Sequence, residues 1–155
     1  MKLDETVRAE LDQTVLCWLA TVGADGTPNV SPKEVFAAHG EDALVIAEIA
    51  SPLSLRNVRA NPKVCVSFID VFRQRGFKVI GEAGIVASDD PAFPGLAVDL
   101  LAKAGGVFEV RHVIHVRIAH ISRIWAPSYR LFPDRPEVER MEDAYRTYGV
   151  QAIPR

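Results

Sequence analysis

The stretch SPLSLRNVRANPKV, from Ser51 to Val64, lies between two apolar segments that are typical of strands. Ser51 followed by Pro52 is a strong helix-start signal, because serine caps a helix and proline fits its first position. The helix should end before Pro62, since the residue before a proline resists helical dihedrals. The sequence therefore predicts a short helix over residues 52–60.

Outward from this helix, apolar runs alternate with turn residues. Helical spacing predicts a first helix that ends near residue 14, and further helices are expected over 89–106 and 135–149. Strands are expected over residues 15–22, 27–38, 42–50, 63–71, 77–88 and 110–127. Hairpin turns between early strands favour an antiparallel sheet, and six strands with few helices favour a small barrel. We expect one domain over residues 1–155, mainly β, with an N-terminal helix and a C-terminal helical tail.

Composition excludes several classes of function. The 155 residues carry a net charge of −2, so no general attraction to nucleic acid or to anionic membranes is expected. No apolar run approaches the roughly 20 residues needed to cross a bilayer, and the charged N-terminus does not resemble a secretory signal. Cys17 and Cys65 lie in strand-like runs, which favours buried thiols over a disulfide framework. The cytoplasm is the expected location.

Two polar clusters are candidates for binding an anion. The start of the 52–60 helix offers free backbone N–H groups, with Ser51, Ser54 and Arg56 close by in sequence. The preceding strand places Asn29, Ser31 and Lys33 on one face, and Val30 and Pro32 on the other. The alternatives are a plain cap with solvated arginines, and a solvent-facing strand. Together, the two clusters favour a phosphate-bearing ligand.

The polar residues outside these two clusters give weaker evidence of a binding site. Strand alternation places His112 and His120 on one face and His115 on the other, so we expect no metal site. Glu34, Glu48 and Glu82 are interpreted as surface residues. The turn at residues 73–76 either reaches a phosphate across a dimer or is simply solvated. Gly81 and Gly84 mark either barrel curvature or the close approach of a ligand.

The segments LATVGADGTPNVSPKE, SLRNVRANPKVCVSF and GFKVIGEAGIV, in this order, resemble the pyridoxamine 5′-phosphate oxidase-like superfamily. The resemblance covers roughly residues 15–88 and, more loosely, the strand VIHVRIAHISRIW. It implies a six-stranded antiparallel split β-barrel that forms a homodimer, with FMN in a groove between the subunits. The resemblance therefore implies a flavoprotein oxidoreductase in which FMN supplies the chemistry, and no side chain is assigned as a catalytic acid or base.

Carried over by position, the resemblance names the cofactor-binding residues. The polar strand and the segment from Ile46 to Ile49 would lie along the flavin, and the helix start would meet its phosphate. The residues implied are Asn29, Val30, Ser31, Pro32, Lys33, Ala47, Glu48, Ile49, Ser51, Ser54 and Arg56. Trp125 and Tyr129 would cover the flavin ring, pack in the dimer interface or close the barrel.

The chain departs from the family pattern at two places, and these change the expected flavin affinity and the expected substrate. Many relatives carry a lysine or an Arg-Lys pair where this chain has Leu53 and Ser54, so weaker and more salt-sensitive flavin binding is expected. Near the C-terminus, RLFPDR echoes the substrate-gripping run of true pyridoxamine phosphate oxidases, but Phe132 and Pro133 interrupt it and no histidine is present. Vitamin B6 phosphate is therefore not the expected substrate. The alternatives are a non-catalytic flavin-binding or sensing protein, a relative that uses F420 or haem, and a dimer without a cofactor.

Overall fold

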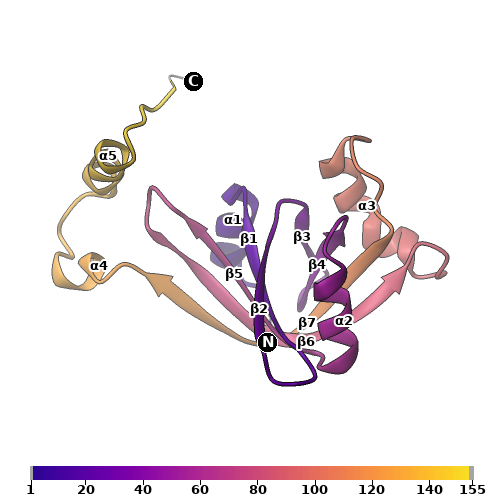
Figure 1. Ribbon diagram of the computed structural model, residues 1–155. Helices are drawn as coiled ribbons and strands as arrows, with labels where there is room; N and C mark the ends of the chain where they lie inside the picture. Colours follow the sequence, from indigo (N-terminus) through magenta and orange to yellow (C-terminus); the bar gives the residue numbers. More distant parts are fainter. Residues whose placement is uncertain (1, 154–155) are drawn as a thin grey trace.

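A computed structural model describes residues 2–153, and the chain is mainly β, as predicted. The strands are β1 (Cys17–Val22), β2 (Pro28–Lys33), β3 (Phe36–His39), β4 (Ala43–Glu48), β5 (Lys63–Asp70), β6 (Arg75–Ala87) and β7 (His112–Trp125). They form one sheet in the order β2-β1-β5-β6-β7-β4-β3, in which each neighbouring pair is antiparallel. Figure 1 shows that this sheet is strongly curled.

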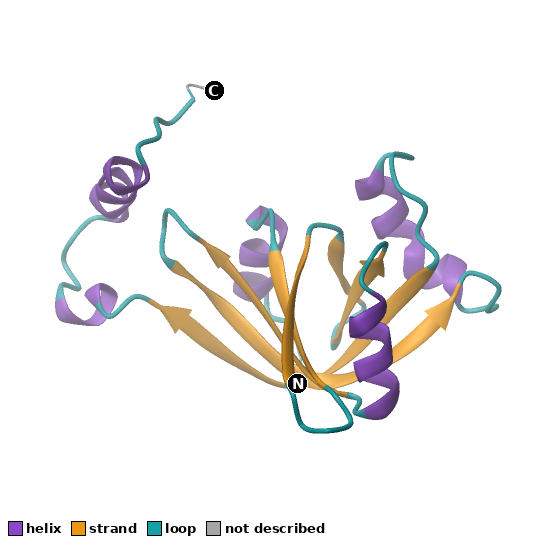
Figure 2. Ribbon diagram, viewed as in Figure 1, coloured by secondary structure: helices purple, strands orange, loops and turns teal. Residues whose placement is uncertain are grey.

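The sheet has seven strands, so the expected number of six is wrong. The segment 27–38, predicted as one strand, forms β2 and β3, which are the two opposite edges of the sheet. Only Glu34 and Val35 lie between them, and a chain of that length reaches at most about 11 Å. The sheet must therefore curl until its edges approach (Figure 2). Within the described residues β2 and β3 are not paired with each other, and we call this open line the split.

The main core lies inside the curled sheet, between two helices. Helix α1 (Glu5–Gln13) starts at Asp4, whose side chain accepts a hydrogen bond from the Val7 N–H group, and it buries Leu11 completely. Helix α2 (Pro52–Ala60) has the predicted bounds and buries Leu55 and Val58 in the same core. Apolar positions at helical spacing thus cover the inward-facing residues of the strands.

Helix α3 (Phe93–Ala104) lies on the outside of β3, β4 and β7 and forms a second core. Its Ala97 and Leu100 are fully buried there against Val45 and Val113. The predicted helix over 89–106 is therefore present but shorter. Gly105 ends it in a left-handed conformation, with φ of 59°, which glycine adopts without steric cost.

A bulge in β7 changes the predicted direction of one histidine. Ile80 pairs with His120 and Gly81 pairs with Ile118, so Ala119 is an extra residue in β7. His112 therefore faces the core while His120 faces outward, and the prediction that they share a face is wrong. A Cβ atom on Gly81 would lie 2.3 Å from the Arg117 carbonyl oxygen. Close approach of the backbone, rather than of a ligand, explains this glycine.

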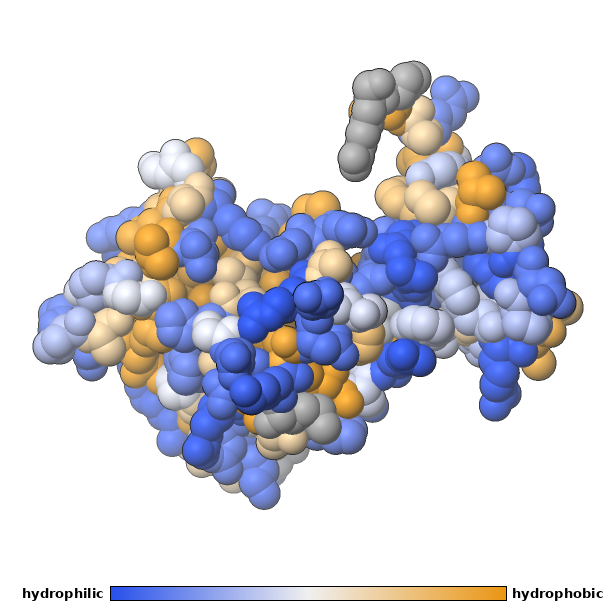
Figure 3. Space-filling model, turned by 180° about the vertical axis from the view of Figure 1, so that it is seen from behind, coloured by the Kyte–Doolittle hydropathy of each residue, from blue (hydrophilic) through white to orange (hydrophobic). Residues whose placement is uncertain are grey.

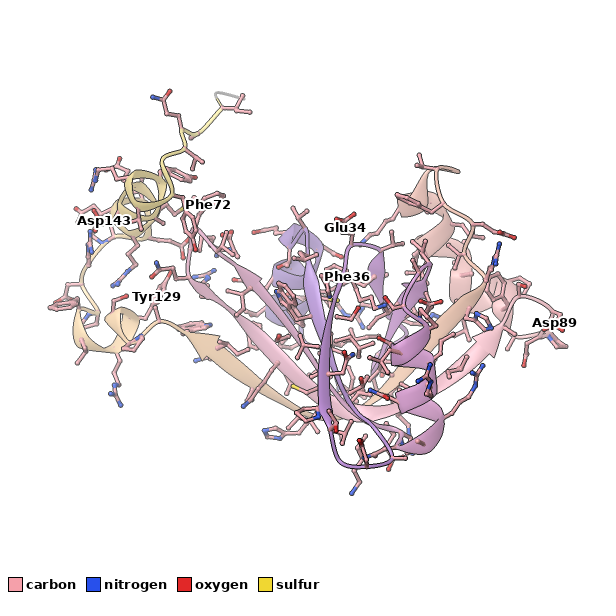
Figure 4. All side chains as sticks on the ribbon, viewed as in Figure 1. Glu34, Phe36, Phe72, Asp89, Tyr129 and Asp143 are labelled. Carbon is pink, nitrogen blue, oxygen red and sulfur yellow. The ribbon has the colours of Figure 1, made fainter. Side chains whose placement is uncertain are left out.

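The chain after β7 forms an arm, which we define as residues 126–150. It contains α4 (Ser128–Leu131), which was not predicted, and α5 (Glu137–Tyr148), which matches the predicted tail helix. In Figure 4 the arm lies beside the tip of the β5–β6 hairpin, where Phe72 is labelled. The Phe72 ring packs against the rings of Tyr145 and Tyr148, at centroid distances of 4.9 and 5.9 Å.

Charged residues complete the attachment of the arm. Arg73 and Arg75 each form ion pairs with Glu10 of α1 and Glu137 of α5, at N–O distances from 2.6 to 3.2 Å. Neither guanidinium is free, so the 73–76 segment is neither a solvated turn nor available for a phosphate. It instead joins the two ends of the described chain.

Two observations bear on the surroundings of the protein. Cys17 is buried and Cys65 is half-buried, and both are free thiols. Burial raises the pKa of the Cys17 thiol to about 12, so this thiol stays protonated and unreactive at neutral pH. Of the helices formed by residues 2–153, none has the length and apolar character that crossing a membrane requires.

Candidate functional site

A cavity of about 230 Å³ lies at the split, between the ends of β2 and β4 and the start of α2. We call it the first cavity. It is lined by Pro32, Lys33, Glu34, Val35, Ala47, Ile49, Ala50, Ser51 and Phe108. The residues around the split thus bring the polar strand and the helix start together, as the sequence predicts.

Lys33 is the most buried charged residue that lines this cavity. Its exposed fraction is 6%, because it lies on the inward face of β2 beside Cys17 of β1. Burial lowers the pKa of Lys33, and the nearby carboxylate of Glu48 opposes this effect. A lysine that is buried but lines a cavity can offer positive charge to a ligand with little competing water.

Glu48 is a buried residue, so its assignment to the surface is wrong. Its exposed fraction is 5%, and its side chain accepts a hydrogen bond from the Ser51 backbone N–H group. It faces His112 across the β4–β7 ladder. Glu48 therefore fixes the backbone just before α2 and does not line the first cavity.

Ser51 precedes α2 but does not cap it with its side chain. No cap hydrogen bond forms, because the Ser51 Oγ atom is 3.2 Å from the Ser31 Oγ atom, on the neighbouring strand. The two hydroxyl groups share one hydrogen bond, and the Ser31 hydroxyl also donates to the Pro32 carbonyl oxygen at 3.4 Å. The predicted cap is thus replaced by a pair of hydroxyls that joins the two polar clusters.

The other predicted site residues lie elsewhere. Ser54 is fully buried, and among the described residues its hydroxyl has no hydrogen-bond partner. Val30 is 57% exposed on the outside of the sheet. Asn29 and Arg56 line another cavity, next to the β1–β2 hairpin. Successive side chains of β2 point to opposite faces of the sheet, so Val30 faces outward while Asn29 and Ser31 face inward.

Sequence reasoning missed four residues of the lining. Glu34, Val35 and Ala50 directly follow or precede predicted residues, so extending the two segments would have found them. Phe108 comes from the loop after α3, far away in sequence. No pattern in the sequence links that loop to β2.

Trp125, at the end of β7, and Tyr129, in the arm, are separate from the first cavity. The Trp125 ring lies 5.3 Å from that of Tyr129 and 4.7 Å from the Arg123 guanidinium carbon. Tyr129 donates a hydrogen bond to the Arg73 carbonyl oxygen at 2.8 Å. Within this chain, Trp125 and Tyr129 therefore attach the arm and line a cavity of their own with Arg130.

Comparison with known proteins assigns the family. The sequence profile of the family described as pyridoxamine 5′-phosphate oxidase matches residues 3–125. The chain belongs to the pyridoxamine 5′-phosphate oxidase family. No curated protein sequence matches the chain. The split, with its first cavity, is thus part of the region that the family shares.

Solved structures agree with this family. An F420 reductase is 29% identical, with a TM-score of 0.60 over 77% of this chain and 98% of its own. A putative pyridoxamine 5′-phosphate oxidase from Lactobacillus delbrueckii is 27% identical, with a TM-score of 0.65 over 78% and 93%. An FMN-binding protein from Syntrophomonas wolfei is 16% identical and shares the fold, with a TM-score of 0.67 over 79% and 86%.

Proposed function

We propose that this member of the pyridoxamine 5′-phosphate oxidase family is an FMN-binding oxidoreductase. The observation that carries the proposal is the first cavity, where the buried Lys33 and Ser51 meet at the start of a helix and Ser31 lies behind Ser51, within hydrogen-bond distance of it. FMN, when bound, would supply hydride and electron transfer. Ser31 and Ser51 would hold its phosphate, and Lys33 would offset negative charge on the ring.

The residues of the first cavity favour flavin over haem. Haem iron in proteins is ligated by His, Cys, Met or Tyr. None of the described residues that line this cavity is of these types. The small residues Ala47 and Ala50 and the apolar side chains of Val35 and Ile49 suit the flat face of a flavin ring instead.

We propose further that the site is completed by a second copy of the chain. The outside of the sheet carries a row of paired residues, Val30, Ala20, Cys65 and Ile80, that crosses four strands. Val30 and Ile80 are 57% and 43% exposed, and Trp18, in the next row, is 43% exposed. Figure 3 shows apolar surface among the polar residues of the body of the protein. An exposed apolar surface of this kind favours a homodimer.

The substrate of the proposed enzyme is not vitamin B6 phosphate. Arg135 is engaged by Glu139 and Asp143, and the carbonyl oxygens of Phe132 and Arg135 accept from Arg140. Arg135, one of the two arginines of the run that echoes the substrate-binding segment of true oxidases, is therefore occupied within the arm, while Arg130 lines a cavity with Trp125 and Tyr129. A cytoplasmic location is consistent with two free thiols.

A second candidate function is the use of the deazaflavin F420. The F420 reductase that is 29% identical to this chain favours it. A non-catalytic flavin carrier would have the same site without turnover.

Absorption spectra of the purified protein test the proposal. FMN gives bands in the blue and near-ultraviolet, whereas F420 gives one band between them. Bleaching by a reduced nicotinamide, followed by reoxidation with turnover, identifies an enzyme and excludes a passive carrier. Colourless protein that cannot be reconstituted with either cofactor would refute the proposed function.

A further inference from the structure

A second cavity, of about 540 Å³, lies beside the first along the same strand and helix. It is lined by Gly23, Ala24, Asp25, Thr27, Pro28, Asn29, Leu53, Arg56 and Asn57. On β2, Asn29 belongs to the second cavity, Lys33 belongs to the first, and Ser31 lies midway between them on the same face. At about 3.3 Å per residue, Asn29 and Lys33 are roughly 13 Å apart along the strand.

The wall of the second cavity is polar and held in place. The side-chain amides of Asn29 and Asn57 both donate to the Thr21 hydroxyl, at 3.4 and 3.0 Å. Thr21 is 1% exposed and Asn57 is 3% exposed, so these bonds are within the protein. The positions of both amides are therefore set before any ligand binds, which lowers the entropic cost of binding.

The charges in this cavity are one free cation and one engaged carboxylate. Arg56 is exposed on α2 and forms no hydrogen bond or ion pair with another described residue. Asp25 accepts hydrogen bonds from the Thr27 backbone N–H and hydroxyl groups, at 3.0 and 2.9 Å, and these bonds lower its pKa. A guanidinium group without a partner is available to bind a phosphate or carboxylate in a bidentate manner.

We propose that the second cavity receives an anionic extension joined to the phosphate of the cofactor in the first cavity. This inference rests on the proposed function. A phosphate held between Ser31 and Ser51 would have the ring on the Lys33 side and would leave the Asn29 side open. An extension on that side reaches Arg56 through the second cavity. The chemistry required is a second negative group, either the second phosphate of a dinucleotide or a carboxylate of an acidic tail.

Calorimetric titration of the apoprotein tests this inference. FMN, FAD, F420 with its glutamate tail and the deazaflavin phosphate without that tail are compared at low and high salt. We expect one extended cofactor to bind at least tenfold more tightly than its short counterpart, and this advantage to shrink as salt rises. Arg56→Gln should remove most of the advantage and leave the affinity for the short cofactor unchanged.

Arg59→Gln is the matched control, because Arg59 is exposed on the same helix but lines a different cavity. It should leave all four affinities unchanged. Preference for FAD identifies a dinucleotide, and preference for tailed F420 identifies an acidic tail. Equal affinity for short and extended cofactors, or an equal loss in both arginine variants, would overturn the inference while FMN binding still supports the proposed function. Failure to bind any of the four cofactors would refute both.

Discussion

The buried charge of Lys33 lowers the stability of the fold, and its position at the first cavity gives a functional reason for keeping it. Burial lowers its pKa, so the folded chain binds this proton less tightly than the unfolded chain. Between the lowered pKa and the ordinary value of 10.5, the stability of the protein therefore rises with pH, and at neutral pH the charge destabilises the fold. A buried charge that is kept in spite of such a cost is a sign of function.

Lys33→Met should stabilise the protein without cofactor. Methionine has a similar volume and no charge, so it removes the cost of burying the ammonium group, and we expect the free energy of unfolding at pH 7 to rise. The difference from wild type should shrink as the pH approaches 10.5, because the unfolded lysine then also loses its proton. Denaturant titration at several pH values measures it. A loss of stability at pH 7 would show that the ammonium group is well paired in the fold.

The same variant should weaken the proposed cofactor site. Without the positive charge, the anionic reduced flavin is less well stabilised, and the two-electron reduction potential should fall by roughly 30 mV, equivalent to a tenfold change in relative affinity. Spectroscopic titration against a dye of known potential measures this shift. Lys2→Met, at an exposed position before α1, is the control and should leave the potential unchanged.

Ser31→Arg tests the position of the phosphate by a gain of affinity, which misfolding cannot imitate. An arginine beside Ser51 adds the charge that Leu53 and Ser54 do not supply. We expect FMN to bind roughly tenfold more tightly, since a hydrogen bond to a charged group contributes about 1.5–3 kcal/mol. Ser88→Arg, an exposed position after β6, should have no effect. Unchanged affinity in both variants would place the phosphate away from Ser31.

At the scale of elements, the arm depends on the tip of the β5–β6 hairpin. Phe72→Ala removes two ring contacts, each of about 0.5–1.5 kcal/mol, so we expect the amides of α5 to exchange hydrogen at least tenfold faster. The amides of β5 and β6 should keep their protection. Val71→Ala, at an exposed position in the same turn, is the control. Full protection of α5 in Phe72→Ala would show that the ion pairs with Glu137 suffice.

The elements that the sequence predicts well are those set by local signals. Proline at both ends fixes the bounds of α2, and the glycines at 23 and 26 give the β1–β2 turn, in which the Gly26 N–H group donates to the Gly23 carbonyl oxygen. The break between β2 and β3 was missed because Glu34 and Val35 carry no turn signal. It is imposed by closure of the sheet, which is a property of the whole fold.

The site was predictable in part, for the same reason. Alternation along β2 correctly grouped Asn29, Ser31 and Lys33 on one face, but it could not tell that this face points inward. The cap expected from Ser51 was lost to a contact with Ser31, which comes from a distant part of the sequence. The bulge at Ala119 reversed His120 for a comparable reason, since it lies opposite Gly81 of the neighbouring strand, a contact that the sequence of β7 alone does not reveal.

At the scale of the whole molecule, the outside of the sheet should hold two chains together. Ile80 lies at the β6 end of the exposed row, so Ile80→Glu places a charge where an apolar contact is proposed. We expect wild type to elute as a dimer and this variant as a monomer in size-exclusion chromatography with light scattering. Val98→Glu, at an exposed apolar position on α3, should remain dimeric.

The dimer also bears on the cofactor, because an open cavity of about 230 Å³ leaves much of a flavin exposed to water. If a second chain covers the ring, Ile80→Glu should lower the affinity for flavin to the same extent as it lowers dimerisation. This effect is expected although Ile80 lines neither cavity. Titration of the variant with FMN, at concentrations on both sides of the dimerisation midpoint, separates the two effects. Stoichiometric flavin binding by a monomer would show that one chain holds the complete site.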